Sequence, residues 1–159
     1  MKIINILNIK HILIFIPLIF GSLIASFFSF ENDKEYNKLI KSKMMPPNYI
    51  FSIVWTILYL LIGISFYYGI NTNNYYNHII PIIGLIINYS YTPVFFKLDN
   101  LILSFVIVLL TLKFAILTFI QFYYYNIIAS YLLIPYILWL IFASYLSYDI
   151  YIINKKHNK

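Results

Sequence analysis

Long apolar segments constrain this chain more than any other feature. Five stretches are nearly free of charged side chains, near residues 11–30, 46–69, 79–96, 101–124 and 127–153. Each is long enough to cross a bilayer as a helix, which takes about 20 residues. A soluble domain of 159 residues could not cover a chain that is 62% hydrophobic and only 10% charged. The sequence therefore predicts a single integral membrane domain over residues 1–159.

The backbone of these segments decides the fold class. In hydrocarbon only helices and closed barrels satisfy their peptide groups, and these segments lack the alternating pattern of barrel strands. We therefore predict an all-α membrane protein, a bundle of five transmembrane helices. The first segment follows Lys2 and Lys10, as a signal peptide would. Its apolar run is longer than a signal sequence needs and no A-x-A cleavage site follows, so we expect a retained helix.

The lysines predict the orientation of the bundle. Five spans place the two ends of the chain on opposite sides, and Lys2 and Lys10 share the side of the N-terminus. The other side carries Lys34, Lys38, Lys41, Lys43, Lys97, Lys155, Lys156 and Lys159. The positive-inside rule makes this lysine-rich side, with the 31–45 loop and the C-terminal tail, cytosolic. The net charge of +6 then reflects the lipid bilayer and needs no nucleic-acid partner.

Few residues are suited to metal binding or acid–base chemistry. The chain has no cysteine, and His11, His78 and His157 are too scattered to form a ligand set. Asp149 is the only carboxylate within a predicted span, so no pair of acids is available for proton transfer. We expect neither a metal site nor a resident cofactor.

Lys113 is unusual because it falls near the middle of a predicted span. From a helix start near Leu101 it lies about 18 Å along the axis. A charged amine at that depth is costly unless it is paired, neutral or reaches towards the interface. Two interpretations remain open: Lys113 binds an anionic group of a ligand, or it snorkels along the lipid-facing surface.

A first motif surrounds the double proline at Pro46 and Pro47. Proline is tolerated in the first turn of a helix, so the pair predicts a helix start at the membrane surface. Residues 35–63 resemble the loop and second helix of the TspO/MBR family, the tryptophan-rich sensory proteins and translocator proteins (peripheral-type benzodiazepine receptors). The residues in register are Tyr36, Leu39, Lys41, Pro46, Pro47, Phe51, Val54, Trp55, Leu58, Tyr59 and Gly63. Glu35, Ser42 and Met44 depart from the family pattern.

Two further segments carry the same resemblance. In the third span Asn88, Phe95 and Phe96 match the family pattern, and Tyr91 stands where the family has tryptophan. The last span matches at Pro135, Tyr136, Trp139, Phe142, Ala143, Leu146, Ile150 and Asn154, with Ser147 and Ile153 as departures. Pro135 is expected to kink this helix, because it has no N–H to donate.

The resemblance implies a cavity between the helices, covered by the 31–45 loop as a lid. The ligands that it implies are tetrapyrroles such as porphyrin and haem, bound as ligands rather than cofactors, and sterols in animal members. The ligand-binding residues that we predict are Phe51, Trp55, Tyr59, Asn88, Tyr91, Trp139, Ala143, Pro46 and Pro47. A plain connector remains the alternative to a lid.

The rise of an α-helix per residue tells us whether the two tryptophans lie at similar depths in the membrane. Trp55 lies about 12 Å, and Trp139 about 21 Å, from the lysine-rich ends of their helices. Asn88 lies about 12 Å from Phe96, so the three share one depth zone under the loop. An aromatic cavity at that depth suits a flat, mostly apolar ligand. Tight core packing of the tryptophans is the alternative, and Asn88 could equally bond to a neighbouring helix.

Several functional questions stay open at this stage. The leading hypothesis is a membrane receptor or carrier for tetrapyrroles and related hydrophobic ligands. The alternative is a porphyrin-degrading photo-oxidoreductase that uses Trp55 and Trp139, and a scaffold without a ligand is the third. Leu146, Tyr151 and Lys155 fit a cholesterol motif loosely, although Ile152 takes its closing basic position in the family's register.

The oligomeric state and the cellular membrane that holds the protein are also open. Family members often form homodimers, but the small-residue pairs Gly21/Ala25 and Ala143/Ser147 do not select one helix face. The host would decide between the mitochondrial outer membrane and a bacterial plasma membrane.

Overall fold

The computed structural model describes residues 13–29, 38–70 and 78–157. Its helices follow the predicted order along the chain. They are η2 (Leu13–Phe15), α2 (Ile16–Ser29), α4 (Asn48–Gly69), α5 (Ile79–Phe96), α6 (Leu101–Tyr125), α7 (Ile127–Tyr131) and α8 (Ile134–His157).

The prediction of an all-α membrane bundle is confirmed. Four helical units are long and apolar enough to cross a bilayer, namely α4, α5, α6 and the combined run Ile127–Lys156, with mean hydropathy from 1.6 to 2.6. The fifth helix, α2, is apolar but shorter, with 14 residues. It lies within the predicted span 11–30, whose first two residues and last residue fall outside the described part of the chain.

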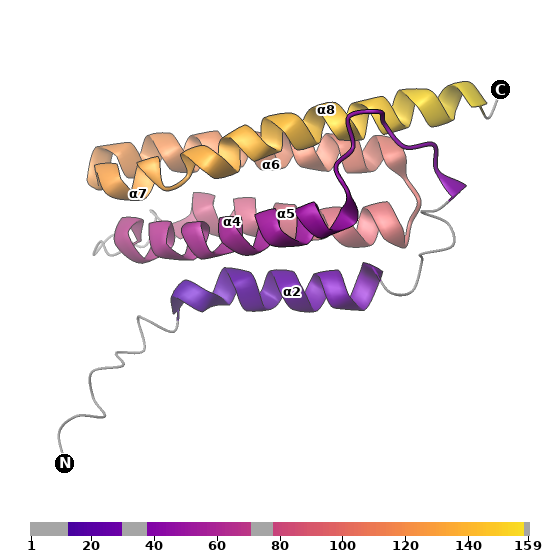
Figure 1. The fold of residues 1–159 in the computed structure, drawn as a ribbon. Helices are drawn as coiled ribbons and strands as arrows, with labels where there is room; N and C mark the ends of the chain where they lie inside the picture. Colours follow the sequence, from indigo (N-terminus) through magenta and orange to yellow (C-terminus); the bar gives the residue numbers. More distant parts are fainter. Residues whose placement is uncertain (1–12, 30–37, 71–77, 158–159) are drawn as a thin grey trace, which may run out of the picture.

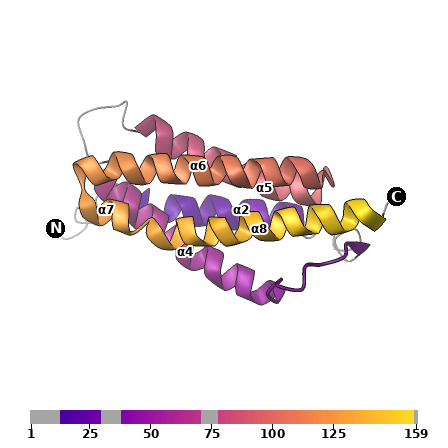
Figure 2. The ribbon, with the colours of Figure 1, turned by 90° about the horizontal axis from the view of Figure 1, so that it is seen from above.

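The helices lie side by side with their long axes roughly aligned (Figures 1 and 2). α6 is the shared neighbour of α5 and α8, and α2 packs against α4 and α5. In Figure 1, α6 and α8 lie above α4 and α5, with α2 below. The segment 38–47, which precedes α4, runs beside the C-terminal half of α8, so the predicted lid and the end of α8 share one end of the bundle.

Prolines and asparagines set the helix ends. Pro47 is the N-cap of α4 with an extended backbone (φ −56°, ψ 147°), so the helix begins at Asn48. Asn100 caps α6 by accepting a hydrogen bond from the Leu103 N–H at 3.0 Å. The predicted helix 127–153 is broken after Tyr131 and resumes at Ile134 as α8. This agrees with the kink expected at Pro135, whose ring would clash with the carbonyl of Tyr131 in a continuous helix.

The end of the bundle away from the 38–47 segment is closely packed. Phe122 and Leu133 are fully buried there, and Ile62 of α4 packs in the same cluster. The Ser65 hydroxyl donates to the Ala129 carbonyl at 2.6 Å, which fastens α4 to α7. A Cβ on Gly63 would overlap the backbone carbonyl of Ile14, so this glycine permits the contact between α4 and η2.

Candidate functional site

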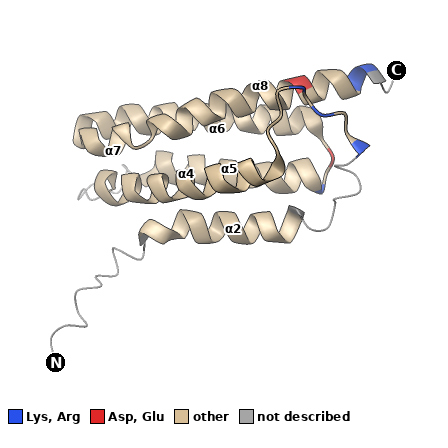
Figure 3. Ribbon diagram, in the orientation of Figure 1, with Lys and Arg blue, Asp and Glu red and all other residues tan. Residues whose placement is uncertain are grey.

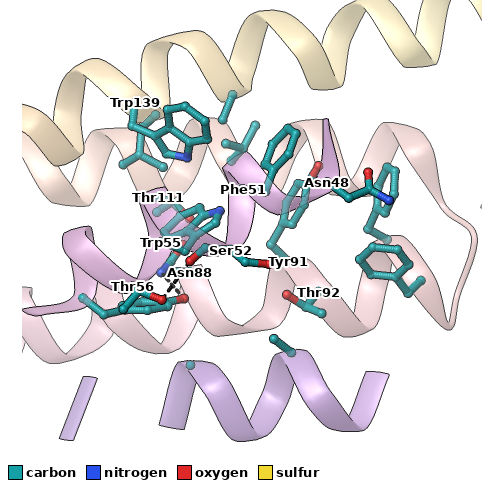
Figure 4. A pocket seen from close by; sticks show the side chains of 18 of the residues that line it. Asn48, Phe51, Ser52, Trp55, Thr56, Asn88, Tyr91, Thr92, Thr111 and Trp139 are labelled. Carbon is teal, nitrogen blue, oxygen red and sulfur yellow. Dashed lines mark hydrogen bonds between the residues drawn. The ribbon is translucent and has the colours of Figure 1, made fainter. Parts of the chain in front are cut away.

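A cavity of about 500 Å³ lies in the half of the bundle nearer the lid. Helices α2, α4, α5, α6 and α8 all contribute to its wall (Figure 4). Its volume falls in the usual range of small-molecule sites, roughly 300–1,000 Å³. Aromatic rings dominate the wall, with hydroxyl and amide side chains between them, and none of the described lining residues is charged.

The structure brings most of the predicted site residues together. Those that line the cavity are Phe51, Trp55, Tyr59, Asn88, Tyr91, Trp139 and Ala143. Pro46 and Pro47 are not among the lining residues, whereas their neighbours Met45 and Asn48 are. The two prolines shape the entry to α4, and the flanking side chains reach the cavity instead. Ligand contact at all of these positions remains a prediction.

The two tryptophans form an aromatic wall that joins α4 to α8. The Trp139 ring meets Phe51 edge-on, with 5.6 Å between centroids. The Trp55 ring lies 5.3 Å from Tyr59 and 6.3 Å from Tyr136. Both indoles line this cavity, and Figure 4 shows them on neighbouring helices.

One polar atom of this wall is left without a partner. Trp139 Nε1 is buried and makes no hydrogen bond to any described residue. A buried donor without an acceptor is costly, and because protein atoms cover Nε1, a ligand in the cavity would reach it only after neighbouring side chains move.

Asn88 serves both roles that the sequence left open. It is 5% exposed, and its Nδ2 donates to the Tyr59 hydroxyl at 3.2 Å, which links α5 to α4. It also lines the cavity. The neighbouring Tyr89 hydroxyl donates to the Pro17 carbonyl at 2.8 Å and so ties α5 to α2. These two bonds fix the deep end of the cavity.

Asn154 of α8 pairs with the described part of the predicted lid. Asn154 accepts a hydrogen bond from the Ile40 N–H at 3.0 Å and donates to the Ile40 carbonyl at 3.0 Å. Its Nδ2 also donates to the Ile150 carbonyl of its own helix at 2.8 Å. Residues 31–37 of the predicted lid lie outside the described chain. We call the pairing of Asn154 with Ile40 the lid latch.

Lys113 does not belong to the cavity. Its side chain is exposed on α6, and it is not among the lining residues. The structure therefore fits the snorkelling interpretation and gives no support to a contact between Lys113 and a ligand in this cavity.

Residues of the small-residue pairs contact other parts of the same chain. A Cβ on Gly21 would overlap the Tyr59 ring, so Gly21 lets α2 approach α4. Ala143 lines the cavity and Ser147 is 2% exposed. Gly21, Ala143 and Ser147 thus serve contacts within the chain, and homodimer formation remains a prediction without an assigned face.

The loose cholesterol motif is divided between two environments. Leu146 is buried and lines the cavity. The Lys155 amine donates instead to the Tyr151 hydroxyl at 3.1 Å, in an exposed pair at the end of α8. The structure thus does not gather the motif around one space.

Sequence reasoning missed the contributions of α2 and α6 to the wall. Leu18 and Gly21 line the cavity from α2, and Thr111 lines it from α6. A signal for α6 was present, because Ser104, Thr111 and Thr118 recur every seventh residue and all three are buried. Their hydroxyls donate to carbonyls of their own helix, Thr111 to Ile107 at 2.9 Å, so they can face the bundle without another partner.

Fold and cavity together define a multi-pass helical membrane protein with an uncharged, aromatic cavity of ligand size. The sequence model of the TspO/MBR family matches residues 13–152, and the chain belongs to this family.

Individual relatives agree with this assignment. The chain is 34% identical over 137 residues to "Tryptophan-rich protein TspO" of Archaeoglobus fulgidus, covering 82% of this chain and 87% of the relative. It is 30% identical over 151 residues to the protein of that name from Bacillus cereus, covering 91% and 97%. "Protein CrtK" of Rhodobacter capsulatus is 26% identical over 128 residues, covering 75% and 78%.

Proposed function

We propose that this membrane protein is a receptor or carrier that binds tetrapyrroles, and related flat hydrophobic molecules such as sterols, in the cavity between its helices. The observation that carries the proposal is the wall itself, where Trp55, Trp139 and Phe51 surround an uncharged space of about 500 Å³. Aromatic faces stack on a flat apolar ring system, and the few polar groups can fix its orientation.

The position of the lid segment also supports binding. The latch between Asn154 and Ile40 holds the described lid segment against α8, beside the cavity half of the bundle. A segment held there would slow the release of a ligand from the cavity.

Titration with protoporphyrin in lipid nanodiscs tests the proposal, read by absorbance and by quenching of tryptophan fluorescence. Ala143→Phe should fill the cavity and abolish saturable binding while the helices stay folded. Leu138→Phe is the matched control, because the Leu138 side chain lies on the same helix and is 62% exposed. This variant should bind like the parent. Equal binding by both variants would place the porphyrin outside the cavity.

The alternative function is a light-dependent porphyrin-degrading oxidoreductase. Its support is that the only two tryptophans of the chain both line the cavity, where an indole could exchange an electron with a photoexcited porphyrin. With dioxygen as the oxidant, this activity would appear as loss of porphyrin absorbance under light and a new product. Loss that persists in the double variant Trp55→Phe/Trp139→Phe would remove the indoles from that reaction.

We further propose that the lid end of the bundle faces the cytosol. Apart from Lys113, the charged residues that the structure describes gather at this end (Figure 3). Ser42 is only 5% exposed, so Lys43→Cys is the better labelling site. It should react from the cytosol, whereas Asn73→Cys, in the connection between α4 and α5, should react from the opposite side. Reaction of both from one side would contradict the five-span orientation.

A further inference from the structure

The described residues of the cavity wall carry no charge, which affects ligands that carry carboxylates. The described wall offers hydroxyls such as Thr92 and Thr111 and the amide of Asn88, but no cation. Transfer of an ionised carboxylate into such a space costs several kcal/mol when no positive partner is supplied. An acidic ligand is therefore driven to keep its ionised groups outside the wall.

Lys97, the C-cap residue of α5, is the described cation that directly follows the lining residues of that helix. Lys97 follows Phe95 and Phe96, which both line the cavity at the lid end. Its Nζ lies 5.9 Å from the ring centroid of Phe28, two residues beyond the lining residue Ser26 of α2. The Lys97 side chain is exposed, so its amine is accessible to an incoming anion.

We propose that the cavity selects flat apolar ligands that carry an ionised carboxylate on one edge, and that Lys97 binds this carboxylate at the rim. The ring system then lies against Trp55 and Trp139, and the acidic edge points to the lid end, where Lys97 and the described lysines of the 38–47 segment lie. The proposal rests on the proposed function, because it assigns an orientation to a ligand in the same cavity.

The test compares protoporphyrin, a diacid, with its neutral dimethyl ester, in nanodiscs of uncharged lipid. Lys97→Gln should weaken the diacid about two- to five-fold, the range of a solvent-exposed ion pair. It should leave the affinity for the ester unchanged, and Lys97→Arg should retain the affinity for the diacid. Lys113→Gln is the matched control, since it removes an exposed lysine that does not line the cavity, and both ligands should then bind as in the parent.

Salt gives a readout on the unmodified chain, in case a variant fails to fold. Raising the ionic strength should weaken the diacid and not the ester, because exposed charge pairs are screened. Equal weakening of both ligands by Lys97→Gln, or an unchanged diacid affinity in that variant, would overturn the proposal. Failure of both ligands to bind the parent would instead overturn the proposed function, so the two failures are distinguishable.

Discussion

The two halves of α4 differ in how closely they pack against the rest of the bundle. From Leu58 onward the helix buries Leu58, Ile62, Gly63, Ser65 and Gly69. Before Leu58 none of its residues is buried, and Phe51, Ser52, Trp55 and Thr56 line the cavity. In the closed half Gly63 and Gly69 allow close approach to η2 and to Phe122, whereas in the open half Phe51 and Trp55 face the cavity.

This comparison teaches where stability and function reside. The closed half depends on contacts such as Gly69 against the Phe122 ring, where a Cβ would come within 2.6 Å of ring atoms. The open half leaves aromatic surface without a protein partner, which costs packing energy and provides a ligand site. Substitutions in the closed half should therefore change stability, and those in the open half should change binding.

The largest effect is expected from Gly63→Val. The new Cβ would overlap the Ile14 carbonyl, a backbone group that cannot move aside as a flexible side chain can. We expect a loss of about 3 kcal/mol in the free energy of unfolding, the upper part of the overpacking range. Ser52→Val places the same side chain on an exposed position of the open half and should cost less than 1 kcal/mol. Unfolding in detergent measures both, and equal losses would contradict the division of α4.

A smaller loss is expected from Phe122→Ala in the closed half. The ring is fully buried and meets Phe66 edge-on at 6.0 Å. Lipid is as apolar as a protein core, so the loss is mainly one of packing, about 2 kcal/mol. Phe51→Ala, on the cavity wall, should cost less than half of that and should weaken porphyrin binding instead. The same unfolding assay, paired with the titration, decides whether the two phenylalanines differ in this way.

The lid latch should control the rate of release more than stability. Asn154→Ala removes both hydrogen bonds to Ile40. Each such bond contributes about 0.5–1.5 kcal/mol, so the loss of both should accelerate ligand dissociation at least about five-fold. Lys155→Ala, which removes only the exposed contact to Tyr151, is the control and should leave the rate unchanged. Stopped-flow displacement measures the rate, and an unchanged rate in Asn154→Ala would make segment 38–47 a plain connector.

The sequence was informative where the lipid environment or a motif left little freedom. Apolar length alone predicted the helices, and Pro135 predicted the break that separates α7 from α8. Depth along the helix axis placed Trp55 and Trp139 in one depth zone, and both line the cavity, while their contact with a ligand remains a prediction. Each of these predictions depends on local geometry within one helix.

The remaining parts of the site depend on how helices rotate against each other. Nothing in the residues of α2 predicted that Gly21 would face Tyr59, because a small residue fits several faces of a helix. The latch between Asn154 and Ile40 joins residues 114 positions apart and depends on the path of the loop. Asn154 was recognised only as a residue in register, and its partner became visible in the three-dimensional arrangement.

The central claim is that Trp55 and Trp139 form one binding wall in the open half. The direct measurement is protoporphyrin titration of the parent, Trp55→Phe, Trp139→Phe and the double variant, with unfolding followed in parallel. Because stacking on an aromatic face contributes roughly 0.5–1.5 kcal/mol, each single variant should bind several-fold more weakly, the double variant more weakly still, and all should unfold like the parent. Parent-like affinity in the double variant, or a loss of stability in place of affinity, would show that the two tryptophans pack the core and do not form the site.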